Sequence, residues 1–317
     1  MVIGNWDICL SIVNSLVPAE FHQDNLKCQV SILTYRSQSL HLPPHVSPYA
    51  IEHRKSDFSP KSLEEAFAGQ DVVISTISGG DFKLQITIID ALVAAGVKRF
   101  IPHEFGHDTL NQGIQARIPK YAGRAKVLHH LENKVAPETP GFDWIGIATG
   151  YTLDSNLING DLGFDMEWHS ATIQGTGDEL FAVSSLARIG QVVTKVLQYW
   201  SEMNSKYVYA AGVITSANDI LWAAEQATGQ QWTVGNHDVQ DSVKEGMSRI
   251  ERGFPDAGLA LLDRSVLYDE ELSALGPFQS QSVNEVLQLH PESIDEIVQA
   301  AYHDLQKHGK PGCGCSS

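Results

Sequence analysis

The chain has 317 residues, of which 43% are hydrophobic and 19% are charged. This composition supplies enough apolar material for one or two folded domains and excludes a disordered chain. Asp and Glu outnumber Lys and Arg by 38 to 22, and the resulting formal charge of −16 disfavours nucleic acid and anionic membrane surfaces as partners. We therefore expect a globular protein whose partner is a small molecule.

Cysteine usage and the start of the chain indicate the compartment. The 4 cysteines are Cys9, Cys28, Cys313 and Cys315, and their number and spacing do not fit a disulfide framework. No basic stretch followed by an apolar one opens the chain, and no apolar run approaches the roughly 20 residues of a membrane span. These features predict a soluble, cytoplasmic protein with a flexible tail over residues 309–317.

The first half of the chain alternates strand-like and helical patterns. Short, apolar, β-branched runs predict strands, and helical runs bounded by Ser, Pro or Gly predict helices. Strands are expected at 28–34, 71–77, 98–102 and 142–148, and helices at 61–68, 84–95 and 120–133. Such alternation predicts βαβ units and hence an α/β, doubly wound parallel sheet.

After about residue 155 the alternation becomes looser. The pattern predicts a hairpin at 164–174, a strongly amphipathic helix at 186–197, a helix at 218–228 that opens with a capping box, and further helices at 238–252 and 292–307. The change of pattern predicts two parts, over 1–154 and 155–308, with the tail beyond them.

Ligands of open parallel sheets bind outside the carboxyl ends of the strands. This rule brings four segments to one crevice, namely 34–37, 75–80, 102–107 and 149–154. The candidate functional residues are therefore sought there.

Four stretches resemble the NmrA-like, isoflavone-reductase-like branch of the atypical short-chain dehydrogenases, in its fungal form. They read DVVISTISGGD, QITIIDALVAAGVKRFIPHEFGHD, IATGYTLDSNL and TIQGTGDELFAVSSLARIGQVVTKVL, and the similarity extends over residues 28–308. The resemblance implies a Rossmann-type domain over 1–154 that binds NADP(H), followed by a smaller α+β part over 155–308 that binds the substrate.

The resemblance assigns residues near the strand ends to the cofactor. Arg36 follows the second strand, where an arginine pairs with the 2′-phosphate of NADP, and Ser37 can add a hydroxyl. Asp57, after the third strand, corresponds to the adenine side. The remaining assigned residues follow the fourth and fifth strands and are Thr76, Ile77, Ser78, Pro102, Glu104 and Phe105.

The N-terminus departs from the family pattern, which opens with a strand and three glycines that let the backbone approach the pyrophosphate. Aligned without gaps, the glycine positions fall on Ile3, Trp6 and Cys9. The first strand is expected to be missing, and only Gly4 and Asn5 remain as cofactor-binding candidates. A wrongly chosen start or splice site is the favoured interpretation, and genuine loss of cofactor binding is the other. Both predict weak or absent NADP(H) binding by this chain.

The catalytic position departs as well. Reductases of this branch use a lysine eight residues before a helical glutamate, and counting back from Glu132 gives Arg124. Arginine stays protonated above pH ~12, so it can hold an anionic oxygen but cannot easily move a proton. Lys120 lies one turn earlier on the same face, and His103 stands where the family usually has serine. We expect His103 or Lys120 to transfer the proton, unless these side chains only form a solvated helix face and a loop hydrogen bond.

Tyr151 and Leu153 follow the sixth strand and are expected to line the substrate side of the crevice. The segment HEFGH at 103–107 matches a zinc-binding H-E-x-x-H pattern. The preceding proline and the internal glycine disfavour the helix that this pattern requires, so no metal is expected.

The sequence thus predicts an NADPH-dependent oxidoreductase that acts on an aromatic or polyketide-like small molecule in fungal secondary metabolism. The departures from the family pattern leave two alternatives open. One is a non-catalytic regulator that senses a dinucleotide. The other is a redox-neutral cyclase or isomerase that uses the same crevice without a cofactor.

Overall fold

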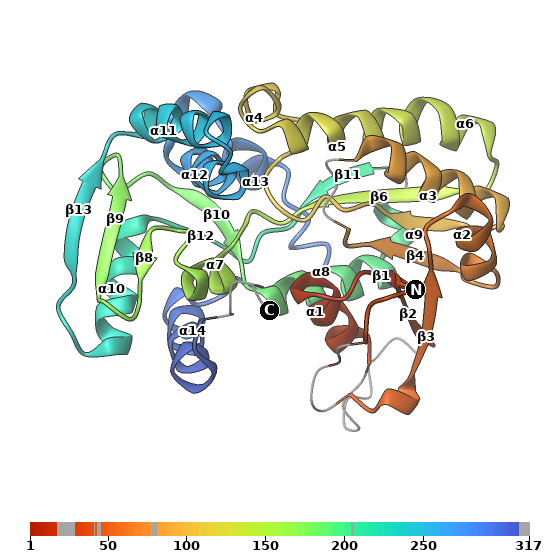
Figure 1. The fold of residues 1–317 in the computed structure, drawn as a ribbon, viewed down its shortest axis with the longest axis horizontal. Helices are drawn as coiled ribbons and strands as arrows, with labels where there is room; N and C mark the ends of the chain where they lie inside the picture. Colours follow the sequence, from red (N-terminus) through yellow and green to blue (C-terminus); the bar gives the residue numbers. More distant parts are fainter. Residues whose placement is uncertain (18–28, 41, 43–45, 78–80, 204–205, 311–317) are drawn as a thin grey trace.

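A computed structural model describes residues 1–17, 29–40, 42, 46–77, 81–203 and 206–310. Figure 1 shows a larger lobe, in which helices flank a central sheet, beside a smaller lobe of short sheets and helices. No helix in these ranges is both long and apolar enough to span a bilayer.

The larger lobe is built on a seven-stranded sheet. Its strands, in spatial order, are β11 (Lys206–Tyr209), β6 (Asp143–Ala148), β5 (Arg99–Ile101), β4 (Val72–Ser75), β1 (Val2–Ile3), β2 (Val30–Tyr35) and β3 (Ile51–Ser56). Every neighbouring pair is parallel, so all the carboxyl ends meet at one edge. The predicted α/β parallel-sheet class is confirmed.

The sheet contains the central strand that was expected to be missing. β1 has only 2 residues, Val2 and Ile3, and it pairs with β2 on one side and β4 on the other. Both side chains are fully buried between the helical layers. Two apolar residues are too few to predict a strand from their pattern. Pairing with β2 and β4 is what orders them as a strand.

Helices cover both faces of this sheet (Figure 1). One layer contains α2 (Pro60–Phe67), α3 (Phe82–Ala94) and α5 (Pro119–His130), and the other contains α1 (Asp7–Leu16) and α8 (Leu186–Gln198). The shorter elements of this lobe are η1 (Pro48–Ala50), α4 (Gln112–Arg117), a π turn at Leu131–Val135, α6 (Ala136–Glu138) and α9 (Trp200–Met203).

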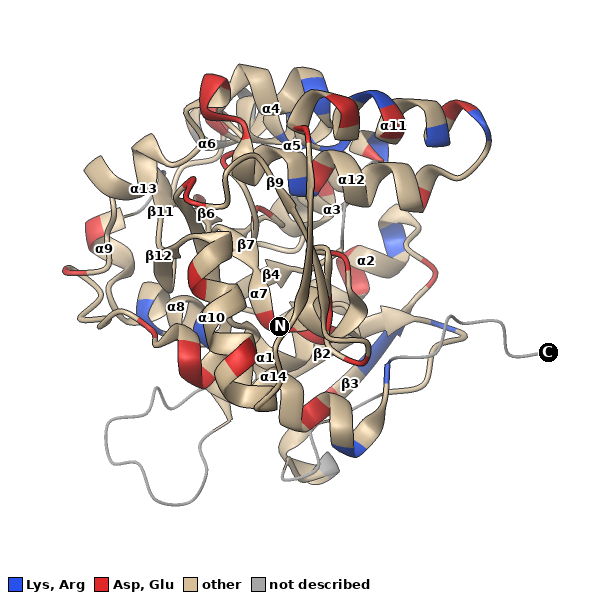
Figure 2. Ribbon diagram, turned by 90° about the vertical axis from the view of Figure 1, so that its left-hand side faces the viewer, with Lys and Arg blue, Asp and Glu red and all other residues tan. Residues whose placement is uncertain are grey.

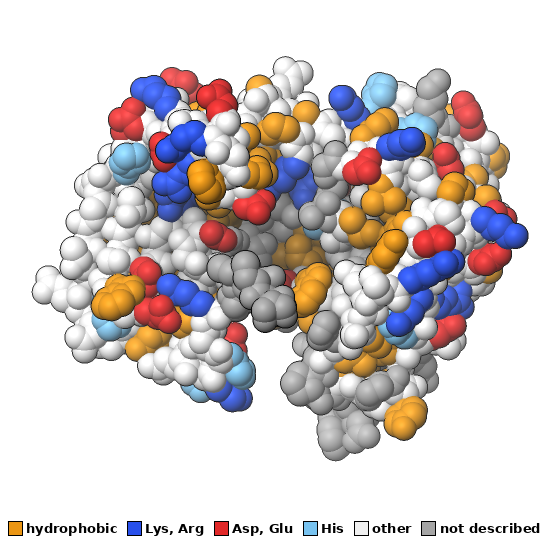
Figure 3. Space-filling view, in the orientation of Figure 1, with side chains coloured by type: hydrophobic (Ala, Val, Ile, Leu, Met, Phe, Trp, Pro, Cys, Tyr) orange, Lys and Arg blue, Asp and Glu red, His pale blue; other side chains and the backbone are white. Residues whose placement is uncertain are grey.

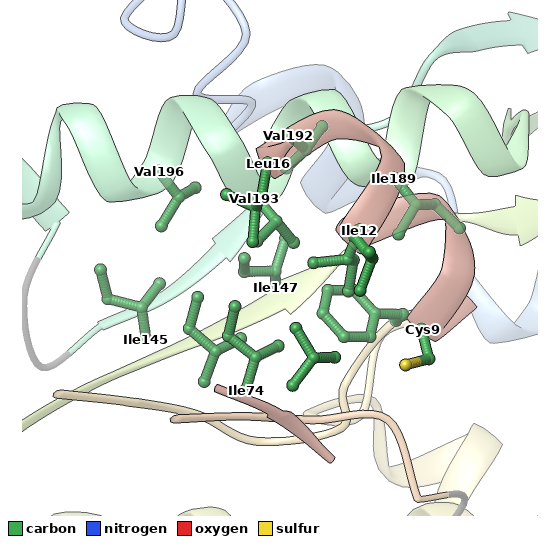
Figure 4. Close-up of a cluster of buried hydrophobic side chains, with 14 of the residues drawn as sticks. Cys9, Ile12, Leu16, Ile74, Ile145, Ile147, Ile189, Val192, Val193 and Val196 are labelled. Atoms are coloured by element: carbon green, nitrogen blue, oxygen red, sulfur yellow. The ribbon is translucent and has the colours of Figure 1, made fainter. Parts of the chain in front are cut away.

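The helices α1 and α8 pack closely although they are far apart in the sequence. Ile12 and Leu16 of α1 share an apolar cluster with Ile189 of α8 (Figure 4). A Cβ at Gly190 would lie 2.5 Å from the carbonyl oxygen of Ser11, so only glycine permits this crossing. The crossing holds the middle of α1 against α8.

The smaller lobe contains two three-stranded sheets. Their strands are β12 (Val213–Thr215), β10 (Phe181–Ser184) and β7 (Tyr151–Thr152) in one, and β13 (Thr233–His237), β9 (Ser170–Gln174) and β8 (Phe164–Asp165) in the other. The surrounding helices are α7 (Leu153–Asn159), α10 (Ala217–Thr228), α11 (Val239–Glu251), α12 (Pro255–Tyr268), η3 (Glu270–Leu272), α13 (Gly276–Ser280) and α14 (Ile294–His308). Figure 2 shows charges of both signs along the outer helix α11.

The local predictions for this lobe are mostly confirmed. β8 and β9 form the expected antiparallel hairpin, and the capping box of Ser216 and Asp219 opens α10, which ends at the left-handed Gly229. The helix α12 was not predicted, because Pro255 and Gly258 obscure its apolar pattern. The domain boundary at 154 stays a prediction, while α8 and β11 from beyond it pack with the larger sheet.

Candidate functional site

A cleft of about 560 Å³ opens at the carboxyl ends of β1, β2 and β4. Among the described residues, its lining includes five of the predicted site residues: Gly4, Asn5, Thr76, Ile77 and His103. Ser78 lies outside the described residues. The structure therefore joins the turn after β1, the end of β4 and the residue that follows Pro102, as the rule for parallel sheets predicts.

The turn after β1 is built around Gly4. Its φ of +138° favours glycine, and a Cβ there would collide with the hydroxyl oxygen of Thr76. That hydroxyl donates to the carbonyl oxygen of Ile3 at 2.8 Å, and Nδ2 of Asn5 donates to the carbonyl oxygen of Ser39 at 2.6 Å. Gly4 is thus required where the turn after β1 meets Thr76.

Trp6 and Asp7 occupy the N-terminus of α1. Trp6 is the N-cap residue; it is 64% exposed and makes no side-chain cap hydrogen bond. Asp7 lies in the first turn and is exposed, and no described residue pairs with its carboxylate. Both line the cleft. Bulk and negative charge therefore stand where a pyrophosphate-binding fold usually has glycine backbone.

Arg36 and Asp57 pair across the ends of β2 and β3, with Nη2 and Oδ2 3.0 Å apart. Hydrogen bonds within its own loop, and then Arg36, lower the pKa of Asp57. Neither residue is among the described residues that line the cleft, but their neighbours Tyr35 and Phe58 do line it and stack with ring centroids 6.2 Å apart. Ser37 is exposed in the turn after β2.

The three predicted catalytic residues lie in one cluster, in which His103 and Arg124 are buried and Lys120 is half-buried. The guanidinium carbon of Arg124 lies 5.0 Å from the ring centre of Tyr121, and Nζ of Lys120 lies 5.3 Å from the same centre. Burial, and then the positive charges of Arg124 and Lys120, hold the pKa of His103 well below its ordinary value. His103 is therefore neutral at physiological pH.

Polar atoms in this cluster are left without partners. Nε and Nη1 of Arg124 are buried and have no hydrogen-bond acceptor among the described residues, and Nδ1 of His103 is in the same situation. An unsatisfied buried donor carries a penalty of roughly 1–3 kcal/mol. Donors fixed in this way can hold an oxygen on which negative charge develops.

Asp263 of α12 belongs to the cluster and was missed by the sequence analysis. Its Oδ1 lies 2.9 Å from Nζ of Lys120, and its Oδ2 lies 4.0 Å from Nε2 of His107. Burial opposes ionisation, but Lys120 and then His107 lower the pKa of Asp263 overall. His107 precedes Asp263 by 156 residues, and with α12 unpredicted no sequence signal connected the two.

The predicted substrate residues have different surroundings. Tyr151 stacks on His107 with ring centroids 5.7 Å apart, which places it at the border of the cluster. Leu153 is fully buried in the apolar core of the smaller lobe.

Three predicted cofactor residues are buried around His103. Pro102 is buried before it, and Phe105 packs in the core of the larger lobe with its ring 5.8 Å from that of His103. Glu104 is 1% exposed, and burial raises its pKa to about 7 although the charge of Arg124 acts in the opposite direction. None of the three is among the described residues that line the cleft.

A second cavity, of about 500 Å³, has His107 in its wall. Apolar side chains such as Phe181 and Phe278 line it, and the described lining residues include no Lys or Arg. The carboxylates of its wall belong to Asp178, Glu179, Asp269 and Glu270. The cavity therefore suits an apolar or aromatic group and disfavours an anionic one.

Comparisons with known proteins agree with this architecture. The profile of the NmrA-like family matches residues 50–306. Oxidoreductase aprR of Aspergillus flavus is 31% identical over 277 residues, which are 87% of this chain and 90% of aprR. The solved structure of AtPrR2 with NADP+ and (+)pinoresinol has a TM-score of 0.69 at 15% identity, covering 95% of this chain and 97% of AtPrR2. An isoflavone reductase structure has a TM-score of 0.67 at 16% identity, covering 94% of this chain and 97% of its own. At these identities the two structures support the fold alone.

Proposed function

This chain belongs to the NmrA-like family as an isoflavone-reductase-like member, and on that premise we propose that it is an NADPH-dependent oxidoreductase. One juxtaposition carries the proposal. The cleft opens at the carboxyl ends of parallel strands, and it reaches His103 of the cluster that contains Arg124 and Lys120. A dinucleotide site thus lies beside groups that can hold a developing charge and deliver a proton.

Residues in and beside the cleft fit the cofactor. Arg36 is the cation that would hold the 2′-phosphate, and the stacked rings of Tyr35 and Phe58 offer an apolar surface to the adenine. Thr76 and Ile77 line the cleft at the end of β4 and would contact a ribose. The middle of the cleft, at the start of α1, fits poorly because it lacks the glycine backbone.

Bound NADPH would supply a hydride to the substrate. Arg124 would hold the substrate oxygen, because its buried Nε and Nη1 have no other acceptor among the described residues. Lys120 is the proton donor that we favour, since Asp263 fixes its position at 2.9 Å. His103 is held neutral, so it would contribute a hydrogen bond rather than the proton.

The second cavity gives the basis for the substrate class. Its aromatic and aliphatic walls suit a ring system, and its carboxylates oppose a negatively charged one. We infer an aromatic or polyketide-like small molecule without a carboxylate or phosphate. We place this reaction in fungal secondary metabolism, and the similarity to an oxidoreductase of Aspergillus flavus supports the fungal part of this proposal.

Two other functions have a specific observation in their favour. Trp6 and Asp7 in the cleft favour a regulator that binds a dinucleotide weakly and does not turn over. The buried, partly unpaired Arg124 would also serve a redox-neutral cyclase or isomerase, whose chemistry needs only an oxygen to be stabilised.

Deuteride transfer distinguishes the three functions. The purified chain is incubated with NADPH deuterated at the transferable position and with a panel of neutral aromatic ketones and enones, and products are analysed by mass spectrometry. The oxidoreductase is expected to give singly deuterated product and to lose most of its rate in Arg124→Lys. Product without deuterium and without added NADPH indicates the redox-neutral enzyme. Binding of NADPH without any product indicates the regulator.

A further inference from the structure

Asp7 has an exposed carboxylate between two hollows of the molecule. It lines the 560 Å³ cleft, and it also lines a groove of about 880 Å³ whose other walls come from α7, α14 and Leu186 of α8. Figure 3 shows the molecule open between the lobes on this side. No described residue pairs with the carboxylate, and no Lys or Arg is among the described residues that line the cleft. Among the described residues, the groups near this charge that can offset it are the N–H groups at the start of α1 and the imidazoles of His303 and His308, which line the same groove.

The position of this charge is unusual for a dinucleotide cleft. Parallel α/β folds bind a pyrophosphate at the N-terminus of the first helix, because its backbone N–H groups and its dipole attract an anion there. A carboxylate in the first turn interacts with the same dipole and repels a phosphate at short range. Trp6, the N-cap residue, adds bulk at the same point.

We propose that Asp7 is a specificity-determining residue that weakens the contact between the start of α1 and the pyrophosphate of NADPH. The cofactor is then held mainly through its own two ends. The inference rests on the proposed function, because it concerns the same cofactor. It predicts a gain of affinity when the carboxylate is removed. A ligand that has the adenosine 2′-phosphate end but no pyrophosphate is expected to be indifferent to the change.

Salt concentration supplies a second signature. Ions screen exposed charges beyond roughly 10 Å at 0.1 M ionic strength. In the unchanged protein, salt weakens the attraction of Arg36 for a phosphate and also weakens the repulsion from Asp7, so the two effects partly cancel. In Asp7→Asn only the attraction remains, and the affinity for NADPH falls more steeply as salt is added.

A purely structural role for Asp7 makes a different prediction. An acidic residue in the first turn stabilises a helix whether or not a ligand binds there. Asp256 is a matched control, since it is exposed in the first turn of α12 in the other lobe. If the aspartates only stabilise their helices, both Asp→Asn variants lower the unfolding temperature slightly and neither changes ligand affinity.

Calorimetric titration of the full chain tests the proposal. NADPH and adenosine 2′-monophosphate are titrated into the unchanged protein, Asp7→Asn and Asp256→Asn at low and high salt, with Asp7→Ser replacing Asp7→Asn if that variant does not fold. We expect the dissociation constant for NADPH to fall about three- to tenfold in the Asp7 variant at low salt, with no change for the monophosphate or in Asp256→Asn. Equal NADPH affinities in folded proteins overturn this inference alone. An equal gain for both ligands also overturns it, because it indicates a general change of charge. If neither protein binds NADPH, the proposed cofactor fails as well.

Discussion

Charged side chains have opposite surroundings at the start of α1 and in the cluster around Arg124. In the cluster, charged groups face one another: Arg124 is buried, and Lys120 lies 2.9 Å from Asp263 with both side chains half-buried. Burial, and then Arg124 and Lys120, lower the pKa of His103. At α1, the carboxylate of Asp7 is exposed and no described residue pairs with it. Neighbouring protein groups therefore stabilise the charges in the cluster, whereas water stabilises the charge of Asp7.

This difference separates stability from ligand binding. Removing one member of a buried charged group leaves its partners uncompensated in a medium that solvates them poorly. Removing an exposed charge deprives no other group of a partner, because water alone solvates that charge. We expect substitutions in the cluster to change unfolding first, and substitutions at α1 to change mainly the affinity for ligands.

Arg124→Met is expected to have the largest effect. Asp263 would lose a cation that lowers its pKa, and the removal of two unpaired buried donors offsets part of this cost, so we expect the free energy of unfolding to fall by about 3 kcal/mol. Urea unfolding followed by circular dichroism measures the change. Lys126→Met is the matched control, because Lys126 is exposed on the same helix and its replacement is expected to change the stability by less than about 0.5 kcal/mol. Similar values for the two variants would contradict the comparison.

Glu104→Gln is expected to change the dependence of stability on pH. Burial raises the pKa of Glu104 from 4.5 to about 7 in the folded chain, which corresponds to about 3 kcal/mol. Between these values the unfolded carboxyl is ionised while the folded one keeps its proton, so its contribution to stability is lost as the pH rises through this window and is constant above it. The glutamine variant lacks this loss and gains stability relative to the unchanged protein between pH 4.5 and 8.

Urea unfolding at pH 4.5, 6 and 8 measures that difference. The exposed Glu64→Gln, on α2, serves as the control and is expected to run parallel to the unchanged protein at all three values. A parallel curve for Glu104→Gln would show that folding does not raise the pKa of Glu104.

The sequence predicted the architecture where the pattern is local. Strand and helix alternation yielded the parallel sheet, and the capping box at Ser216 fixed the start of α10. It did not predict β1, since two residues carry no periodicity and are ordered by the neighbouring strands.

The candidate site was predicted in part for the same reason. His103, Lys120 and Arg124 lie close together in the sequence or on one helix face, and the structure brings them together. Asp263 comes from an unpredicted helix in the other lobe, and only tertiary packing places it beside Lys120. The sequence shows an aspartate at position 7, but only the structure shows that its carboxylate is exposed and that no described residue pairs with it.

Asp263→Asn is expected to have an intermediate effect. The amide keeps the shape but loses the charge that faces Lys120 and His107, and Lys120 is exposed enough to be solvated instead. We expect a loss of about 1–3 kcal/mol in the free energy of unfolding. If Asp263 positions the proton donor, kcat falls about tenfold or more while KM changes little. A change in KM alone would assign Asp263 to substrate binding.

Asp7→Asn tests the exposed charge and is expected to have the smallest effect on stability. The carboxylate contributes only its interaction with the dipole of α1, so its replacement is expected to lower the free energy of unfolding by about 0.3–1 kcal/mol at low salt. The loss should shrink as salt is added, because the carboxylate is exposed. Thermal unfolding of Asp7→Asn and Asp256→Asn side by side measures it. If Asp7→Asn lowers the free energy of unfolding as much as Arg124→Met does, Asp7 makes stabilising contacts within the protein. The contrast between the half-buried charged cluster and the solvated charge of Asp7 would then be wrong.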